Sequence, residues 1–299
     1  MTVATDEEER SGRRPTRMER GNRRLMTGAA PQPDPGETMF ASPPSSVVEF
    51  YDGLAADYHL VYGDRWDDAV AQQGAALDTV IRGTRPHARD VLDCSCGIGT
   101  QAIGLALRGY RVHGTDISER SIRRARVEAT RLGAELAFGV ADFRHLDPVA
   151  GDFDVVISCD NAIPHLLEDA DVAQALRAMR AKLRPDGLLI ISIRDYDKAL
   201  IERPTTAPPL LLAGPPRRLF VRLHDWDAPE SQLYTVRFFV LTETPTGWTL
   251  AQHATRYRAI TSAALTRAVH EAGFDDATWH AADSLSFLQP VMTATSTAA

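Results

Sequence analysis

Cysteine is scarce in this chain, with three among 299 residues, and long apolar runs are absent. Three cysteines make neither the framework of a disulfide-rich domain nor the spacing of a zinc site. No apolar run approaches the roughly 20 residues that cross a bilayer. We therefore expect a cytoplasmic protein with no metal site and no membrane partner, in which Cys94 and Cys96 fill buried space.

Positive charge is also in short supply: 33 Lys and Arg stand against 40 Asp and Glu, so the net charge is -7. Sequence-independent binding to nucleic acid depends on Lys and Arg, and this balance argues against a nucleic-acid partner. Apolar residues make up 44% of the chain, which is enough for a substantial core. The oligomeric state is left open, a homodimer included.

Residues 1–45 have a composition typical of disorder. An acidic cluster at 6–9 is followed by seven arginines between Arg10 and Arg24, and no periodic apolar face appears before residue 45. We assign this extension no catalytic role. The ordered chain should begin where Ser45 or Ser46 caps a first helix.

The middle of the chain alternates between strand and helix patterns. Residues 46–86 are expected to form a helical lid, with a second helical stretch at 66–80. Strands are expected at 90–94, 111–115, 135–140, 153–158 and 188–193, and helices at 100–108, 118–132 and 170–183. Such alternation predicts an α/β fold of the Rossmann-like type, with a mostly parallel sheet flanked by helices.

The later third of the chain has a different pattern. Segments 218–225, 233–242 and 248–258 are rich in aromatic and β-branched residues and are separated by short turn sequences. They predict an added antiparallel meander. A helix at 262–272 and the apolar stretch 285–294 would complete the main sheet.

The most informative segment is VLDCSCGIGT at 91–100. A strand ends at Asp93, Gly97 and Gly99 allow a tight turn, and the helix that begins near Thr100 presents unpaired N–H groups. At the tip of the next strand, Asp116 can accept both hydroxyls of a ribose. Together these features predict a nucleotide site.

Two nucleotides fit this site. The G-x-G-x-x-A pattern that begins at Gly97 matches the relaxed dinucleotide fingerprint, and Asp116 lies near the expected spacing. However, Asp93 would face a pyrophosphate, whereas its charge suits the ammonium group of S-adenosylmethionine (SAM), directly or through water. Asp142 follows a third apolar run and can accept from an adenine amino group, with Phe143 covering the base. Three acids at successive strand tips favour SAM.

Residues 90–195 resemble the class I SAM-dependent methyltransferases on these motifs. The wider chain, from about 47 to 293, is similar to the small-molecule branch that contains glycine and sarcosine N-methyltransferases. That narrower match is carried by FYDGLAADYH at 50–59, CDNAIPHL at 159–166 and IRDYD at 193–197. Cys96 before Gly97 departs from the commonest form of the first motif. The resemblance implies a SAM-binding core at 87–299 with a substrate cover inserted at about 196–234. The cover would contain a loop at 204–216 and at least the first antiparallel strand, and the last of those strands would belong to the edge of the main sheet.

The same resemblance implies SAM as the cofactor and S-adenosylhomocysteine as the product. Asp160 and Asn161, at the carboxyl end of the fourth strand, should border the sulfonium and the acceptor. The expected cofactor-binding residues are Asp93, Cys94, Gly97, Gly99, Asp116, Ile117, Asp142, Phe143, Asp160 and Asn161.

Four residues are expected near the reacting atoms. Arg194 resembles the arginine that clamps the substrate carboxylate in glycine-type enzymes, a task that suits a guanidinium; the alternative is an ion pair with Asp195 or Asp197. Tyr58 and His59 belong, by resemblance, to the lid over the methionine end of SAM, although a tyrosine at this place can also be a core residue.

The fourth residue, His165, could take a proton or orient the acceptor, unless it only bonds backbone at a helix start. Because the methyl donor is already activated, positioning of donor and acceptor can supply most of the rate, so catalytic side chains can be few.

Three functions remain compatible with the sequence. The leading one is SAM-dependent methylation of a small molecule, an amine or amino-acid nitrogen, whose carboxylate Arg194 holds. The second is C- or O-methylation of an aromatic specialised metabolite, such as an indole or a cyclic dipeptide, with Trp66, Trp226 or Tyr234 lining the pocket. The third is a non-catalytic SAM-binding protein.

Overall fold

The computed structural model describes residues 44–296. The N-terminal extension that the sequence predicts to be disordered lies outside the described residues, except for its last two positions. Within residues 44–296, no helix combines the length and apolar character that crossing a bilayer requires.

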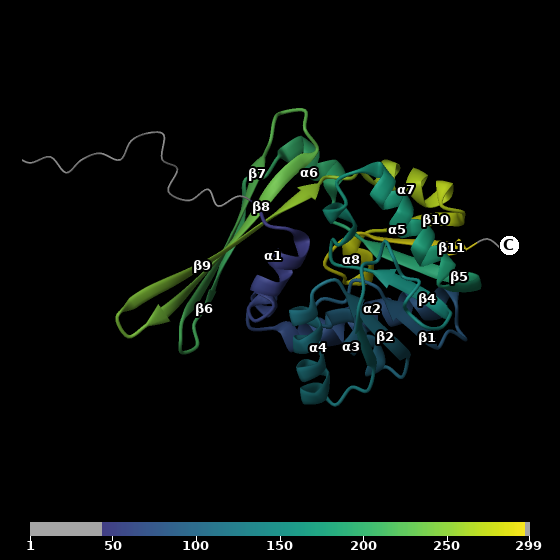
Figure 1. Ribbon diagram of the computed structural model, residues 1–299, viewed down its shortest axis with the longest axis horizontal. Coiled ribbons are helices and arrows are strands. Elements are labelled where there is room, and N and C mark those ends of the chain that lie inside the picture. The colour runs from purple at the N-terminus through teal and green to yellow at the C-terminus, as the bar shows by residue number, and fades with distance from the viewer. Residues whose placement is uncertain (1–43, 297–299) are drawn as a thin grey trace, which may run out of the picture. The chain divides into compact units, whose positions relative to one another are not determined.

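A seven-stranded sheet forms the centre of the described fold, in the order β10-β11-β5-β4-β1-β2-β3 (Figure 1). Its strands are β1 (Asp90–Asp93), β2 (Arg111–Asp116), β3 (Ala137–Val140), β4 (Phe153–Ser158), β5 (Leu183–Ser192), β10 (Phe274–His280) and β11 (Val291–Ser296). Strands β1 to β5 pair in parallel, and β11 runs antiparallel to both of its neighbours. The carboxyl ends of β1, β2 and β4 therefore meet at one edge.

Helices cover both faces of this sheet because successive strand residues point to opposite sides. Leu92 and Leu189 pack with α5 and α7 on one side, and Val91 and Leu188 pack with α2 and α3 on the other. The larger helices are α2 (Trp66–Thr84), α3 (Thr100–Ala106), α4 (Glu119–Leu132), α5 (Asp169–Ala181) and α7 (Ser262–Glu271). The shorter ones are α1 (Val47–Leu54), η1 (Tyr58–Tyr62), η2 (Ile163–His165), α6 (Tyr196–Glu202) and α8 (Ala282–Leu285).

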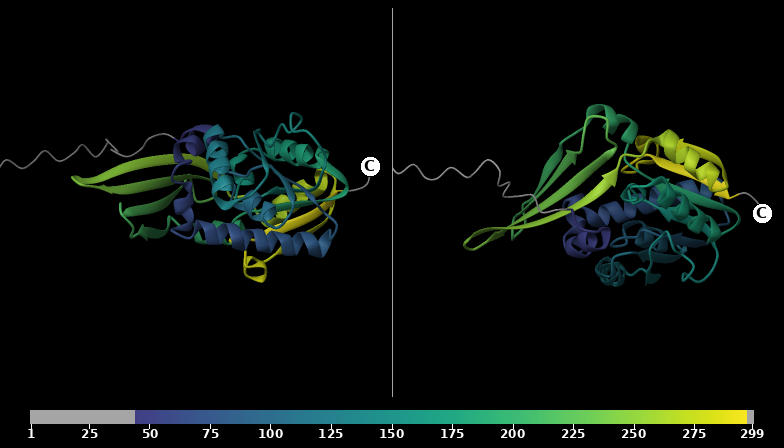
Figure 2. Two further views of the ribbon diagram at one scale, coloured as in Figure 1. Left: turned by 90° about the horizontal axis from the view of Figure 1, so that it is seen from below. Right: turned by 45° about the horizontal axis from the view of Figure 1, so that its top comes forward.

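A second, antiparallel sheet lies beside the first. It consists of β6 (Thr206–Leu212), β7 (Arg218–Trp226), β8 (Leu233–Thr244) and β9 (Gly247–Arg258). Figure 2 shows these strands, in green, extending beyond the parallel sheet in two further views. One face joins the main core: Phe50 of α1 packs against Phe238 of β8, with ring centroids 5.4 Å apart. The strands thus come against the lid helix and the carboxyl edge of the parallel sheet.

The predicted α/β alternation and the added antiparallel strands are confirmed, and Ser46 caps α1 as expected. Some bounds differ. Strand β5 begins at Leu183, before the expected start at 188, and runs through the segment 185–187, with Asp186 at φ 60°. The second sheet continues to Arg258, past the expected end of the cover at 234.

Segment 204–216, expected to be a loop, contains the strand β6. Pro208 and Pro209 have no N–H to donate, which argues against a central strand. The structure accommodates them because β6 is an edge strand, and its register shifts between Ala207 and Leu210. The unpredicted strand β10 is likewise an edge strand with an irregular register.

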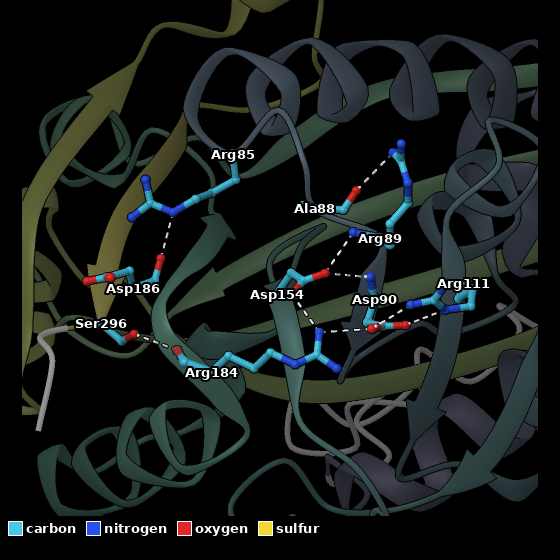
Figure 3. A network of polar contacts seen from close by, with 9 residues as sticks. All are labelled: Arg85, Ala88, Arg89, Asp90, Arg111, Asp154, Arg184, Asp186 and Ser296. Atoms are coloured by element: carbon cyan, nitrogen blue, oxygen red, sulfur yellow. Dashed lines mark hydrogen bonds and ion pairs between the residues drawn. The ribbon is translucent and has the colours of Figure 1, made fainter.

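Matched charges occupy the amino-terminal edge of the parallel sheet (Figure 3). Arg111 binds Asp90 through Nε and Nη2 at 2.6 and 2.8 Å, and Arg184 bridges Asp90 and Asp154 at 2.8 and 2.5 Å. The second oxygen of Asp154 accepts two backbone N–H bonds from the start of β1. Each of these charges has its partner, so this edge is structural.

Two glycines set the distance between α2 and α3. A Cβ on Gly104 would lie 3.0 Å from Cα of Gly74 and would collide with the carbonyl oxygen of Val70, and a Cβ on Gly74 would lie 2.6 Å from the carbonyl carbon of Gly104. The helix after the motif loop is thus held against the long helix by a backbone contact.

We predict that Gly104→Ala lowers the free energy of unfolding by about 1–3 kcal/mol, because a methyl group must be forced into a filled contact. Gly83→Ala is the matched control, since Gly83 lies in the same helix pair and a Cβ added there would meet no atom within 4 Å. Urea denaturation measures both variants. Equal stabilities would contradict the packing described.

Candidate functional site

The loop between β1 and α3 adopts a backbone that only glycine accommodates well. Gly97 has φ 53° and Gly99 has φ 97°, and a Cβ on Gly99 would lie 2.8 Å from Cδ1 of Ile103. The N–H of Gly97 donates to Oδ2 of Asp116 at 2.8 Å. The motif loop is therefore fastened to the tip of β2.

Asp116 is buried at this point of the sheet. Its Oδ1 accepts from the N–H of Ser118 at 2.9 Å, so each carboxylate oxygen has one backbone donor. Burial raises the pKa of Asp116 from its ordinary 3.8 to about 6, in spite of these bonds. Each oxygen keeps a second acceptor site, which suits the two hydroxyls of a ribose.

A cavity of about 480 Å³ opens at the carboxyl edge of the parallel sheet. Of the predicted cofactor-binding residues, the structure brings seven together on its wall: Cys94, Gly97, Asp116, Ile117, Asp142, Phe143 and Asp160. Asp93, Gly99 and Asn161 do not line this cavity. Two of the residues predicted near the reacting atoms, Tyr58 and His165, do line it.

Asp93 is buried at the end of β1 with an incomplete set of partners. Its Oδ1 accepts from the N–H of Ser95 at 3.3 Å, and its Oδ2 has no hydrogen-bond partner in the described residues. Burial, together with the negative charges of Asp116 and Asp160, raises the pKa of Asp93 to about 8. A buried carboxyl group with an unpaired oxygen is costly unless a cation or donor reaches it, so Asp93 fits the ammonium group for which the sequence proposed it.

Asp142 is held by its neighbour Arg144. The guanidinium donates to Oδ2 from Nη2 at 2.6 Å, and the backbone N–H of Arg144 donates to Oδ1 at 2.9 Å. Burial alone would raise the pKa of Asp142, but the bonds from Arg144 outweigh it and lower this pKa. The wall beside Phe143 thus carries an ionised, fixed acceptor, as adenine binding requires.

Asp160 and Asn161 follow β4 in the left-handed backbone region, at φ 58° and 72°, which non-glycine residues seldom adopt. Their N–H groups donate to Oγ and O of Ser192, at 2.8 and 3.1 Å. Asn161 Oδ1 accepts from the N–H of Arg194 at 3.1 Å, while its Nδ2 has no partner. The carboxylate of Asp160, which accepts from the hydroxyl of Tyr62, lines the cavity. Strained backbone of this kind is a mark of functional sites.

Aromatic side chains close the cavity from the lid. The hydroxyl of Tyr51 lies 2.8 Å from Nε2 of His165, and the His165 ring packs on Tyr257 with centroids 4.2 Å apart. Burial lowers the pKa of His165 to about 3, so its imidazole stays neutral at physiological pH. The geometry suits positioning by His165 better than proton transfer.

His59 does not share the cavity with Tyr58. It lines a different hollow, of about 630 Å³, together with Trp66, Arg124 and Arg218. Its predicted place over the methionine end of the cofactor therefore stays a prediction.

Arg194 leaves the end of β5 toward the antiparallel sheet. Its guanidinium lies over the ring of Tyr257, 5.9 Å from the centroid, and its Nη1 is 3.4 Å from Nε2 of His224. Because Tyr257 also packs on His165, this contact connects Arg194 to the cavity wall.

The ion pair considered as the alternative for Arg194 does not form. Asp195 caps α6 by accepting from the N–H of Lys198, and Asp197 accepts from the N–H of Ser262. Neither forms an ion pair with Arg194, and no other carboxylate of the described residues does so.

Some residues at or near the site have no predicted role in the sequence. Tyr51 lines the cavity, whereas Tyr257 and Arg222 do not line it and come from strands whose partners the sequence does not assign. Alternation along 218–226 was the available signal for Arg222, since it falls between Phe220 and His224 on one face.

Comparison with known proteins agrees with this geometry. Residues 91–187 match the family model described as a methyltransferase domain. Glycine/sarcosine N-methyltransferase from Parasynechococcus marenigrum (strain WH8102) is 34% identical over 169 residues, which cover 55% of this chain and 60% of that relative. The chain thus matches less than two thirds of the length of this curated relative.

Two solved structures share the fold. The sugar N-methyltransferase KedS8 from Streptoalloteichus sp ATCC 53650 superposes with a TM-score of 0.68 at 18% identity, covering 86% of this chain and 97% of that one. The amino pentose methyltransferase CalS10 from Micromonospora echinaspora gives 0.64 at 22% identity, covering 80% and 96%. At these identities the likeness is one of fold.

The fold is that of a class I SAM-dependent methyltransferase, as the sequence predicted. Residues 91–187 are the part of this fold that is similar to the methyltransferase-domain model, and a glycine/sarcosine N-methyltransferase is among the similar relatives.

We predict that Asp93→Asn changes how stability depends on pH. Because the folded protein keeps the Asp93 proton up to a pKa of about 8 while the unfolded chain loses it near 3.8, the wild type loses stability as pH rises between these values. One such group contributes a slope of at most about 1.4 kcal/mol per pH unit.

Urea denaturation of the cofactor-free protein from pH 5 to 8 measures this difference. The variant should gain stability relative to the wild type as pH rises. Two parallel curves would show that Asp93 is not buried as described.

Proposed function

We propose that this protein is an enzyme that transfers the methyl group of SAM to the nitrogen of a small amine or amino acid. SAM is the expected cofactor and S-adenosylhomocysteine the product. One observation carries the choice of acceptor: Arg194 has no carboxylate partner among the described residues and lies over Tyr257, whose ring packs on His165 of the cavity wall, although Arg194 itself does not line the cavity. A carboxylate on the acceptor would give this guanidinium an anionic partner.

When SAM is bound, it supplies an electrophilic methyl group. The acceptor nitrogen would form a bond to the methyl carbon with its lone pair while the carbon–sulfur bond breaks. The electrons of the broken bond would remain on sulfur, and the methylated nitrogen would release a proton to solvent. The chain's task is to hold the two reactants in line and to exclude water.

Named residues of the cavity suit the parts of the cofactor. Asp116 offers both carboxylate oxygens to the ribose, and Asp142 with Phe143 suits the adenine. Asp93 does not line the cavity, but its unpartnered Oδ2 supports a role in holding the ammonium group, directly or through a water. Tyr58 lines the cavity, which supports its role as part of the lid.

Transfer to nitrogen has further support in the names of similar proteins. The relative is named a glycine/sarcosine N-methyltransferase, and one of the similar structures is named a sugar N-methyltransferase. Both names describe an acceptor whose reacting atom is nitrogen.

A second candidate function is methylation of a carbon or hydroxyl of an aromatic metabolite. It is favoured by the stack of Trp226, Tyr234 and Tyr257, with centroids 4.6 and 5.6 Å apart and interplanar angles of 29° and 25°. None of these three residues lines the cavity; they form an aromatic stack next to Arg194, against which a ring system could pack.

Asp116→Ala should weaken SAM binding at least about tenfold, because the loss of charge-assisted hydrogen bonds costs about 1.5–3 kcal/mol each. Titration calorimetry measures the affinity. Asp147→Ala is the control, since Asp147 is exposed and does not line the cavity. Unchanged affinity in Asp116→Ala would refute the ribose assignment.

Arg194→Ala distinguishes the two candidate functions. If the acceptor is an amino acid, KM for carboxylate-bearing amines should rise by about 100-fold, since two charge-assisted bonds are lost, while the SAM affinity is kept. Steady-state kinetics over a panel of amines, indoles and phenols provides the measurement. Methylation of a ring compound with unaltered kinetics in the variant would favour the aromatic acceptor.

A further inference from the structure

Arg222 occupies an unusual place on the antiparallel sheet. Residues two apart on a strand share a face, so Arg222 points to the same side as Phe220 and His224. Both of these neighbours are buried, at 3% and 7% exposure, and Phe220 belongs to the main core. A guanidinium therefore stands on the face of β7 that packs inward.

This guanidinium lacks the partner that other arginines of the sheet have. Its Nε is buried without a hydrogen-bond partner, and no ion pair to Arg222 occurs among residues 44–296. The remaining arginines of β7, β8 and β9 each bind a carboxylate: Arg218 binds Asp57, Arg237 binds Asp225, Arg256 binds Asp227 and Arg258 binds Asp169. Arg222 is only partly buried, but its Nε is shielded from solvent and has no acceptor, and an unpaired buried N–H donor is costly. An anion at this face would supply the missing acceptor.

Arg194, whose guanidinium also has no carboxylate partner among the described residues, lies next to this face of β7. His224, the next inward residue on β7, is 3.4 Å from Arg194. Burial and the positive charge of Arg194 together lower the pKa of Arg222 to about 10. Arg194 also lies over the ring of Tyr257, which packs on His165 of the cavity wall.

We propose that Arg222 and Arg194 together bind an oxyanion of the methyl acceptor, so that the substrate is an amine bearing a carboxylate or a phosphoryl-type group. This inference rests on the proposed function and adds a second specificity residue to it. Arg194 comes from the parallel sheet and Arg222 from the antiparallel one. An anion between them accepts hydrogen bonds from both guanidiniums, whereas an uncharged substrate leaves both without an anionic partner.

Binding to the S-adenosylhomocysteine-loaded protein tests this arrangement without turnover. The probes are glycine, aminomethylphosphonate and glycinamide, which share an amine and differ in the charge beside it. The wild type should bind at least one anionic probe about tenfold or more tightly than glycinamide, as expected for charge-assisted bonds. Glycine against aminomethylphosphonate distinguishes a carboxylate from a phosphoryl site.

Three variants sharpen the test. Arg222→Gln should lose most of the anion preference with the S-adenosylhomocysteine affinity unchanged, and Arg222→Lys should restore part of it. Arg217→Gln is the matched control, because Arg217 is exposed and paired with Glu243. Thermal unfolding shows that each variant is folded. The inference is overturned if the wild type shows no anion preference, including no binding at all, or if Arg222→Gln keeps the preference.

Methyl transfer from SAM to the same probes separates this inference from the proposed function. If the wild type binds anionic probes through Arg222 yet methylates no amine, the proposed function fails and the anion site stands. If glycinamide is methylated as well as glycine and Arg222→Gln changes neither rate, the function stands and the anion site fails.

Discussion

The meeting of parallel strand ends at one edge of the sheet is the constraint on which the site depends. β1, β2 and β4 run side by side in the same direction, so the acids at or just past their ends, Asp93, Asp116 and Asp160, come to the same edge, where Asp116 and Asp160 line one cavity. Burial raises the pKa of each, and for Asp93 the charges of the other two acids add to it. Burying these acids is unfavourable, and hydrogen bonds keep their loops fixed. The N–H of Gly97 donates to Asp116, and the N–H of Asp160 donates to Oγ of Ser192.

The two edges of the same sheet differ in how their charges are matched. At the amino edge, Asp90 and Asp154 are bound by Arg111 and Arg184. At the carboxyl edge, Asp93 keeps an unpaired oxygen. Unpaired buried charge is unfavourable, so a ligand is expected to bind at the edge of the sheet where such charge is found.

Much of this fold could be predicted from sequence because its signals are local. Residues adjacent in the sequence determine the motif loop at 91–100, the Ser118 cap and the alternation of β2, α4 and β4. The strand β6 could not be predicted from its own residues, because Pro208 and Pro209 are unfavourable in a strand. Only its pairing with β7 makes this segment a strand. The same distinction between local signals and strand pairing applies to the site. Asp116 and Asp142 follow from their strand ends, whereas Arg222 required the partner of its strand to be known.

The central claim is that carboxylates at adjoining strand tips serve one sulfonium nucleoside. Competitive titration of SAM and NADH into the same protein tests it most directly, since both ligands fit the glycine motif but only one brings a cation to Asp93 instead of a pyrophosphate. The account predicts that SAM binds and that NADH neither binds tightly nor displaces it. Tight binding of NADH without binding of SAM would contradict it.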